Sequence, residues 1–186
     1  RSFSASITEY RLVLRRVRFE DNISTQANDA HGGALHAASF FTGEPFVLID
    51  DCDFIDNEAK SGGGAVRVIG PAGNFGGEVV VRRSRFAGNR SGGAGGAAIL
   101  ASSSSFQVQI EDSVFDGNVT TGNVSTAAGA VNLDTISSAE VLRSTFSSNV
   151  GVRGGALRST AATRIADSLW SDNVASLGGG AVWGNR

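Results

Sequence analysis

Apolar and polar residues alternate in six short segments spread along the chain. The segments read LVLRRVRF, VLIDDCDF, VVVRRSRF, VQIEDSVF, EVLRSTF and RIADSLW, and each one closes on an aromatic ring. The position five residues before each ring is always apolar: Leu14, Ile49, Val81, Ile110, Val141 and Ile165. Alternation with a period of two and a preference for β-branched residues predicts β-strands, and the apolar spacing of an amphipathic helix is absent. The pattern predicts an all-β protein.

Two phrases recur in a fixed order around these segments. The first is a ring followed three residues later by asparagine, with rings at Phe19, Phe54, Phe86, Phe115, Phe146 and Trp170 and asparagines at Asn22, Asn57, Asn89, Asn118, Asn149 and Asn173. The second joins glycines, an alanine and an aliphatic residue, and its alanines are Ala34, Ala65, Ala98, Ala130, Ala156 and Ala181. These alanines are 31, 33, 32, 26 and 25 residues apart. A period of this length indicates an array of six repeats.

Strands that recur at this interval, without two-residue hairpin turns between them, are best paired in parallel, one coil upon the next. Equivalent residues would then stack about 4.8 Å apart. We therefore expect a single domain over residues 1–186: a right-handed parallel β-helix (solenoid) of about six coils with three short strands each. The strands are expected at the apolar alternation, at the ring and at the glycine–alanine phrase. The rings should stack inside, and the asparagines should stand at turns, where this residue tolerates the left-handed conformation.

On these two phrases the chain resembles the polymorphic outer-membrane protein repeats first described in chlamydiae, which are defined by F-x-x-N and G-G-A-[ILV]. The resemblance covers nearly the whole chain, with both motifs in order. It implies a right-handed β-helix on a secreted or surface-exposed protein, often the passenger of an adhesin. Outer-membrane anchoring does not carry over with it.

Composition and charge exclude several classes of partner. The chain has 186 residues, a formal net charge of −2 and no basic run, so no nucleic-acid partner is expected. Its apolar runs are too short for a membrane span. The single cysteine, Cys52, excludes an internal disulfide framework and stands where later repeats have serine, as a small stacked residue. No cofactor or metal is expected, because His31 and His36 lack a cysteine partner and a repeated ligand pattern.

The most suggestive catalytic cluster is Asp50, Asp51 and Asp53, since pectin-cleaving β-helices carry clustered aspartates on a strand. Alignment of the repeats favours another interpretation. The sign of the charge alternates from repeat to repeat at three positions. Three residues before the ring the repeats carry Arg16, Asp51, Arg83, Asp112, Arg143 and Asp167. Four residues before it they begin with Arg15, Asp50, Arg82 and Glu111, and one residue before it with Arg18, Asp53 and Arg85. Opposite charges on neighbouring strands stabilise each other, and like charges do the opposite. We interpret the aspartates as members of structural charge columns and expect no catalytic residue.

Two features are open to contacts with other molecules. The connections between the glycine–alanine phrase and the next strand vary most, so Phe40, Phe41 and Phe75 are candidates for a binding loop. Four N-x-[ST] sequons occur, at Asn22, Asn89, Asn118 and Asn123. Asn123 stands in a longer connection and is the most accessible for glycosylation.

The function expected from these patterns is that of a non-catalytic structural or adhesive module of a secreted or cell-surface protein, acting as a rigid scaffold or interaction surface. Expected partners are other protein subunits or further coils of the same protein, and a cell-surface protein or glycan. The alternatives are a carbohydrate-active β-helix enzyme (a polysaccharide lyase or hydrolase) and a subunit of an extracellular filament or multiprotein complex. Neither end of the array carries a recognisable cap, so we expect further coils or neighbouring subunits to cover the ends.

Overall fold

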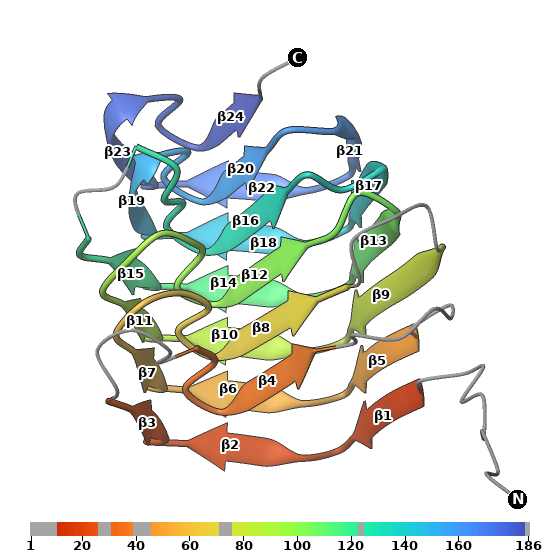
Figure 1. The fold of residues 1–186 in the computed structure, drawn as a ribbon. Helices are drawn as coiled ribbons and strands as arrows, with labels where there is room; N and C mark the ends of the chain where they lie inside the picture. The colour runs from red at the N-terminus through yellow and green to blue at the C-terminus, as the bar shows by residue number, and fades with distance from the viewer. Residues whose placement is uncertain (1–10, 26–30, 39–45, 71–75, 123–124, 185–186) are drawn as a thin grey trace, which may run out of the picture.

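The computed structural model describes residues 11–25, 31–38, 46–70, 76–122 and 125–184. In this part of the chain all regular structure is β, and the strands form four parallel sheets of six strands each (Figure 1). The chain visits the four sheets in the same order in every repeat, which builds a parallel β-solenoid. The all-β solenoid predicted from the alternation is confirmed.

The first two sheets hold the apolar alternations and the rings. Strands of the first sheet are β1 (Arg11–Arg15), β5 (Phe46–Asp50), β9 (Gly77–Arg82), β13 (Phe106–Glu111), β17 (Ser138–Leu142) and β21 (Ala162–Ala166). Strands of the second sheet are β2 (Arg18–Glu20), β6 (Asp53–Ile55), β10 (Arg85–Ala87), β14 (Val114–Asp116), β18 (Thr145–Ser147) and β22 (Leu169–Ser171).

The other two sheets follow the asparagine and the glycine–alanine phrase. Strands of the third sheet are β3 (Ile23–Ser24), β7 (Glu58–Ala59), β11 (Arg90–Ser91), β15 (Val119–Thr120), β19 (Val150–Arg153) and β23 (Val174–Gly178). Strands of the fourth sheet are β4 (Leu35–Ala38), β8 (Val66–Ile69), β12 (Ile99–Ser102), β16 (Val131–Asp134), β20 (Leu157–Ser159) and β24 (Val182–Gly184).

The prediction of three strands per repeat is wrong, because each repeat contributes a strand to four sheets. The three expected strands are present, and the additional strand lies in the third sheet, directly after the asparagine. In the first four repeats this strand has two residues, as in β3, which is too short to show any alternation in the sequence. The right-handed sense and the number of coils stay predictions.

The rings of the second sheet form one continuous stack. Each ring residue pairs directly with the ring residue of the next repeat, from Phe19 in β2 to Trp170 in β22. Neighbouring ring centroids lie between 4.1 and 4.9 Å apart, and the ring planes are close to parallel. The four inner rings are fully buried. The core is therefore built along the axis, with each repeat packing on its neighbours.

A second column of identical side chains follows at the turn between the second and third sheets. The asparagines there are fully buried in the four inner repeats. The amide oxygen of Asn89 accepts two hydrogen bonds from Asn57, one from its backbone N–H and one from Nδ2, both at 3.0 Å. Nδ2 of Asn89 donates to the Phe54 carbonyl at 2.9 Å and to Oδ1 of Asn118 at 2.9 Å. Every polar atom of the buried amide is thus satisfied, as burial requires.

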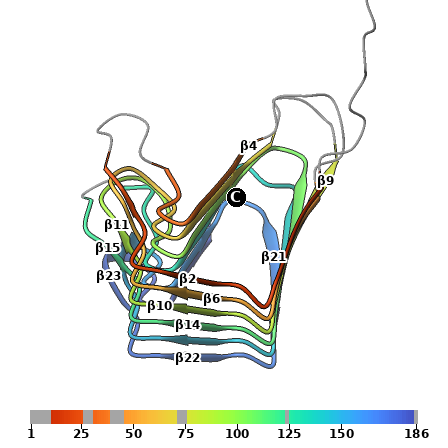
Figure 2. The same cartoon turned by 90° about the horizontal axis from the view of Figure 1, so that it is seen from below.

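The corner between the first and second sheets has left-handed backbone in every repeat. Its residues have φ between 47° and 55° and are Arg16, Asp51, Arg83, Asp112, Arg143 and Asp167. Aspartate tolerates this conformation better than arginine does, so the corner geometry comes from the coil and not from local preference. Seen from below, the corners of successive repeats follow one another in regular steps, and the connections from the third to the fourth sheet form a lobe beside the fourth sheet (Figure 2).

Candidate functional site

The aspartates of the suggested catalytic cluster occupy three different structural positions. Asp50 ends β5 of the first sheet, Asp51 takes the left-handed corner, and Asp53 begins β6 of the second sheet. Asp50 is 5% exposed, whereas Asp51 is exposed and Asp53 is half-buried. Each carboxylate therefore has to be judged by its own surroundings.

Asp50 is enclosed by arginines from the repeats on either side of its own. Its carboxylate pairs with Nη2 of Arg83, with Nη2 of Arg82 at 3.1 Å and with Nε of Arg15 at 3.8 Å. Burial raises the pKa of Asp50, but the hydrogen bond from Arg82 and the charges of the three arginines outweigh it, so the pKa lies below its ordinary value. A carboxylate held in its ionised form in this way is a weak general base, which favours a structural role.

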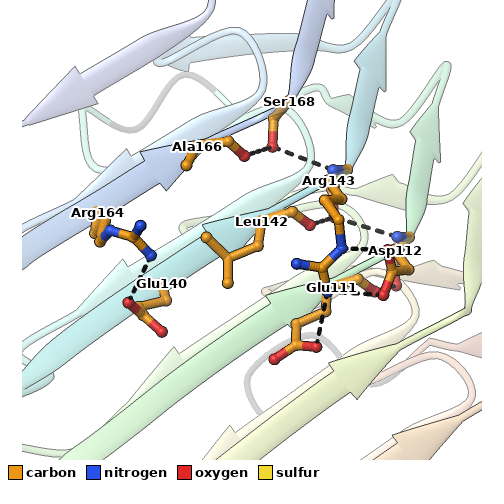
Figure 3. Close-up of polar contacts among 10 residues, drawn as sticks. Glu111, Asp112, Glu140, Leu142, Arg143, Arg164, Ala166 and Ser168 are labelled. Carbon is orange, nitrogen blue, oxygen red and sulfur yellow. Dashed lines mark hydrogen bonds and ion pairs between the residues drawn. The ribbon is translucent and has the colours of Figure 1, made fainter.

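A second cluster of ion pairs, around an exposed carboxylate, lies in the upper half of the solenoid (Figure 3). Arg143 donates two hydrogen bonds to the carboxylate of Asp112, from Nε to Oδ1 at 2.8 Å and from Nη2 to Oδ2 at 3.0 Å. Its Nη2 also donates to Oε2 of Glu111 at 3.2 Å. The hydrogen bond from Arg143 lowers the pKa of Asp112. On the outer face of the first sheet, Arg164 of β21 pairs with Glu140 of β17 at 3.1 Å. Both contacts join neighbouring repeats, so the charges hold the array together along its axis.

The charge columns have the expected register but not all the expected pairs. Arg15, Asp50, Arg82 and Glu111 are consecutive Cα partners in the first sheet. Arg83 binds Asp50 of the adjacent column, and among the described residues no ion pair involves Asp51. Aligning the repeats of this chain identifies which charged residues are neighbours, but it does not determine which arginine pairs with which carboxylate.

A groove runs beside the fourth sheet, between its outer face and the lobe. Its floor includes Arg67, Leu100 and Asn132, which are consecutive partners in β8, β12 and β16. Its wall comes from the connections after the third sheet and includes His31 and Thr126. The hollow has a volume of about 520 Å³. Because one residue per repeat lines the floor, the groove follows the solenoid axis.

A buried arginine holds two of the residues that line the groove. Arg158 is 6% exposed, and its Nη1 donates to Oδ1 of Asn132 and to Oδ1 of Asp134, both at 2.9 Å. The guanidinium lies 5.2 Å from the ring centroid of Trp183, as does that of Arg153. Asp134, the carboxylate of the groove, is thus held by an ion pair.

One histidine, His31, lines this groove, and the other, His36, lies beside it. Nδ1 of His31 is 2.5 Å from Oγ of Ser61, and its ring meets the ring of His36 edge-on at 5.6 Å. Burial lowers the pKa of His36, which favours the neutral imidazole. Within the described residues, no group of three or more His, Cys, Asp or Glu side chains could hold a metal ion.

The groove was missed in the sequence, although a signal for it was present. The first outward residue of each fourth-sheet strand directly follows the aliphatic residue of the glycine–alanine phrase; these residues are His36, Arg67, Leu100, Asn132, Arg158 and Trp183. The sequence pattern instead predicts a binding loop at Phe40, Phe41 and Phe75, which lie outside the described residues. Asn123 also lies outside them.

Two of the sequon asparagines are built into the buried column. Asn89 and Asn118 are fully buried, and Nδ2 of each donates two hydrogen bonds. A glycan would have to replace one of these hydrogens, so the folded chain excludes glycosylation at both positions. Cys52 is similarly enclosed: it is 3% exposed, and its Sγ lies 3.3 Å from the Asp50 carbonyl in the column that later holds serines.

In comparisons with known proteins, no family model, no curated protein and no solved structure matches the chain. In the described part of the chain, no helix is long and apolar enough to cross a membrane. The function therefore has to be argued from the geometry of this solenoid.

Proposed function

We propose that the chain is a non-catalytic structural or adhesive module of a secreted or cell-surface protein. One observation carries the proposal: side chains of the same kind form unbroken columns from β2 to β22 and along the adjoining turn, and these columns consist of stacked rings and hydrogen-bonded asparagines. Side chains locked between neighbouring repeats make a stiff rod that presents its outer faces at fixed spacing.

The ion pairs support the same role. Carboxylates that could serve as acid or base, Asp50, Asp112 and Asp134, are each bound by an arginine of another repeat. A general base needs a pKa near the working pH, but the pKa values of Asp50 and Asp112 are lowered from their ordinary values, away from neutral pH. The two recurring phrases also support the assignment to the polymorphic outer-membrane protein repeat family, whose members are surface-exposed and often adhesive.

The fourth-sheet groove is the surface that we assign to binding. It is long, follows the axis and offers hydroxyl, amide and charged groups beside the apolar Leu100. This mixture suits the hydroxyl-rich surface of a cell-surface glycan.

The proposal is tested with the purified 186-residue chain on an array of cell-surface glycans and, separately, in digestion of acidic polysaccharides. We expect saturable binding to at least one glycan and no change in polysaccharide length. Leu100→Arg in the groove should abolish binding, whereas Gln107→Arg on the outer face of the first sheet should leave it unchanged. Depolymerisation by the wild type that is lost in Asp134→Asn would overturn the proposal in favour of the carbohydrate-active enzyme.

A further inference from the structure

The groove beside the fourth sheet has two positively charged residues in one repeat. Lys60 lies on its wall, directly after β7, and Arg67 lies on its floor in β8. The chain reverses between them at Gly63, which has a left-handed φ of 65°. A Cβ atom at Gly63 would lie 3.0 Å from Cβ of Arg67, so wall and floor are close at this point. Both cations therefore line the same hollow.

These two cations break the repeat pattern. The backbone hydrogen bonds that continue the third sheet define the position of Lys60 in the other repeats. The residues at that position are Thr25, Gly92 and Thr121. The Cα partners of Arg67 in the adjacent repeats are His36 and Leu100. Residues that hold a solenoid together recur from repeat to repeat, as the rings and the asparagines do. The occurrence of both cations in one repeat is therefore better explained by binding than by stacking.

The single acidic residue among the described lining residues does not offset this charge. Asp134 belongs to β16, two strands along the fourth sheet from β8, and its carboxylate pairs with Nη1 of Arg158 at 2.9 Å. Lys60 is exposed and forms no ion pair with any described residue. The described lining is thus net positive, although the chain as a whole has a formal net charge of −2.

A hollow with these groups favours an anionic ligand over a neutral one. A guanidinium such as that of Arg67 donates parallel hydrogen bonds to two oxygens of a carboxylate or sulfate, and the ammonium of Lys60 adds a point charge from the wall. Charges that line a cleft also attract counter-ions more strongly than charges on an open surface do. Further along the axis, Leu100 and Thr126 offer an apolar contact and a hydroxyl group to an uncharged part of the ligand.

We propose that the groove binds an acidic glycan, with a carboxylate or sulfate group of one sugar residue held between Lys60 and Arg67. This inference rests on the proposed function and names the chemical class of its glycan. An acidic protein segment fits less well, because it would bring further carboxylates beside Leu100 and Asp134, where no described lining residue is a cation.

The first test compares ligands of different charge by isothermal titration calorimetry with the 186-residue chain. A hyaluronan hexasaccharide carries carboxylates, a keratan sulfate fragment carries sulfates without carboxylates, and chitohexaose is neutral. We expect at least one charged glycan to bind at least tenfold more tightly than chitohexaose, and its affinity to fall as the salt concentration rises. The two charged glycans show which anion is preferred. A polyglutamate peptide should bind no better than chitohexaose.

The second test removes the exposed charge from the groove. Lys60→Gln should weaken binding of the charged glycan about tenfold, and Lys60→Arg should restore most of that loss. Arg85→Gln removes a positive charge from the exposed outer face of the second sheet and is the matched control, with the affinity of the wild type. Circular dichroism confirms that each variant is folded.

Leu100→Arg does not test the charge of the ligand. A Cβ atom at Gly62 would lie 3.1 Å from Cδ2 of Leu100, so this side chain already reaches the wall. The longer arginine would block the groove for any glycan, whereas Lys60→Gln leaves the groove open.

The outcomes separate this inference from the proposed function. Equal affinities for charged and neutral glycans, or a Lys60→Gln variant that binds the charged glycan as the wild type does, would overturn the acidic ligand and leave glycan binding intact. Tighter binding of polyglutamate than of either charged glycan would overturn it in favour of a protein partner. Failure to bind any of the glycans would overturn both the inference and the binding role of the groove.

Discussion

Replacement of Asn89 by alanine tests whether the buried asparagine column holds the solenoid together. The side chain is fully buried and takes part in four hydrogen bonds: two accepted from Asn57, one donated to the Phe54 carbonyl and one donated to Asn118. At a net contribution of about 1 kcal/mol per bond, their loss costs about 4 kcal/mol. The buried N–H of Asn57 and the Phe54 carbonyl would also lose their partners, which raises the expected cost to about 6 kcal/mol.

Asn22→Ala is the matched control at the lower edge. Asn22 is half-buried, and its side chain makes two hydrogen bonds, to Asn57 and to the Glu20 carbonyl. Its removal leaves fewer buried groups without partners, so we expect less than half the cost of Asn89→Ala. Urea denaturation followed by circular dichroism gives both free energies of unfolding. An Asn89→Ala variant that loses no more stability than Asn22→Ala would refute the reasoning.

Asn89→Asp separates the hydrogen bonds from the space that the side chain fills. Aspartate keeps the oxygen that accepts from Asn57, but it cannot donate, and its charge would face the Phe54 carbonyl and the amide oxygen of Asn118. Burial without a cation raises the pKa of such a carboxyl in the folded state. The stability of this variant should therefore rise as the pH falls through that pKa, because protonation removes the charge and restores one donor. A pH-independent loss would contradict this account.

Three further changes test other parts of the structure. Phe86→Ala removes a fully buried ring with neighbours at 4.7 and 4.9 Å and should cost about 3–5 kcal/mol in urea denaturation. Because the pKa of Asp50 is lowered in the folded state, its stabilisation is complete above the unfolded pKa and is lost as the pH falls through the folded one. The wild type should thus lose more stability on acidification than Asp50→Asn, and Asp51→Asn should behave as the wild type. Cys52→Ser should be neutral or slightly stabilising in thermal unfolding, since serine fills this column in later repeats, and native Cys52 should resist thiol reagents because it is 3% exposed.

The repeat period and the alternation were enough to predict the stacking direction of this fold. A residue repeated at a constant interval, such as the phenylalanine of F-x-x-N, reaches its own kind only if the repeats are stacked in parallel. The same reasoning gave the register, because the core face of a strand is fixed once one inward residue is known. The third sheet was not predictable in this way, since a two-residue strand such as β7 has no alternation to read.

The sequence by itself determined which residues share a column, and the tertiary structure decided what each column does. The sequence places Arg83 and Asp51 in one charge column, but in the fold Arg83 pairs with the buried Asp50, which also binds Arg82. The groove on the fourth sheet depends equally on the fold. His31 and Asn132 are far apart in sequence, and they come to line one hollow because the connections after the third sheet form a lobe beside the fourth sheet. The position of a residue within its repeat can be read from the sequence spacing alone. An ion pair or a groove depends on how several repeats are placed relative to one another, and no single repeat encodes that placement.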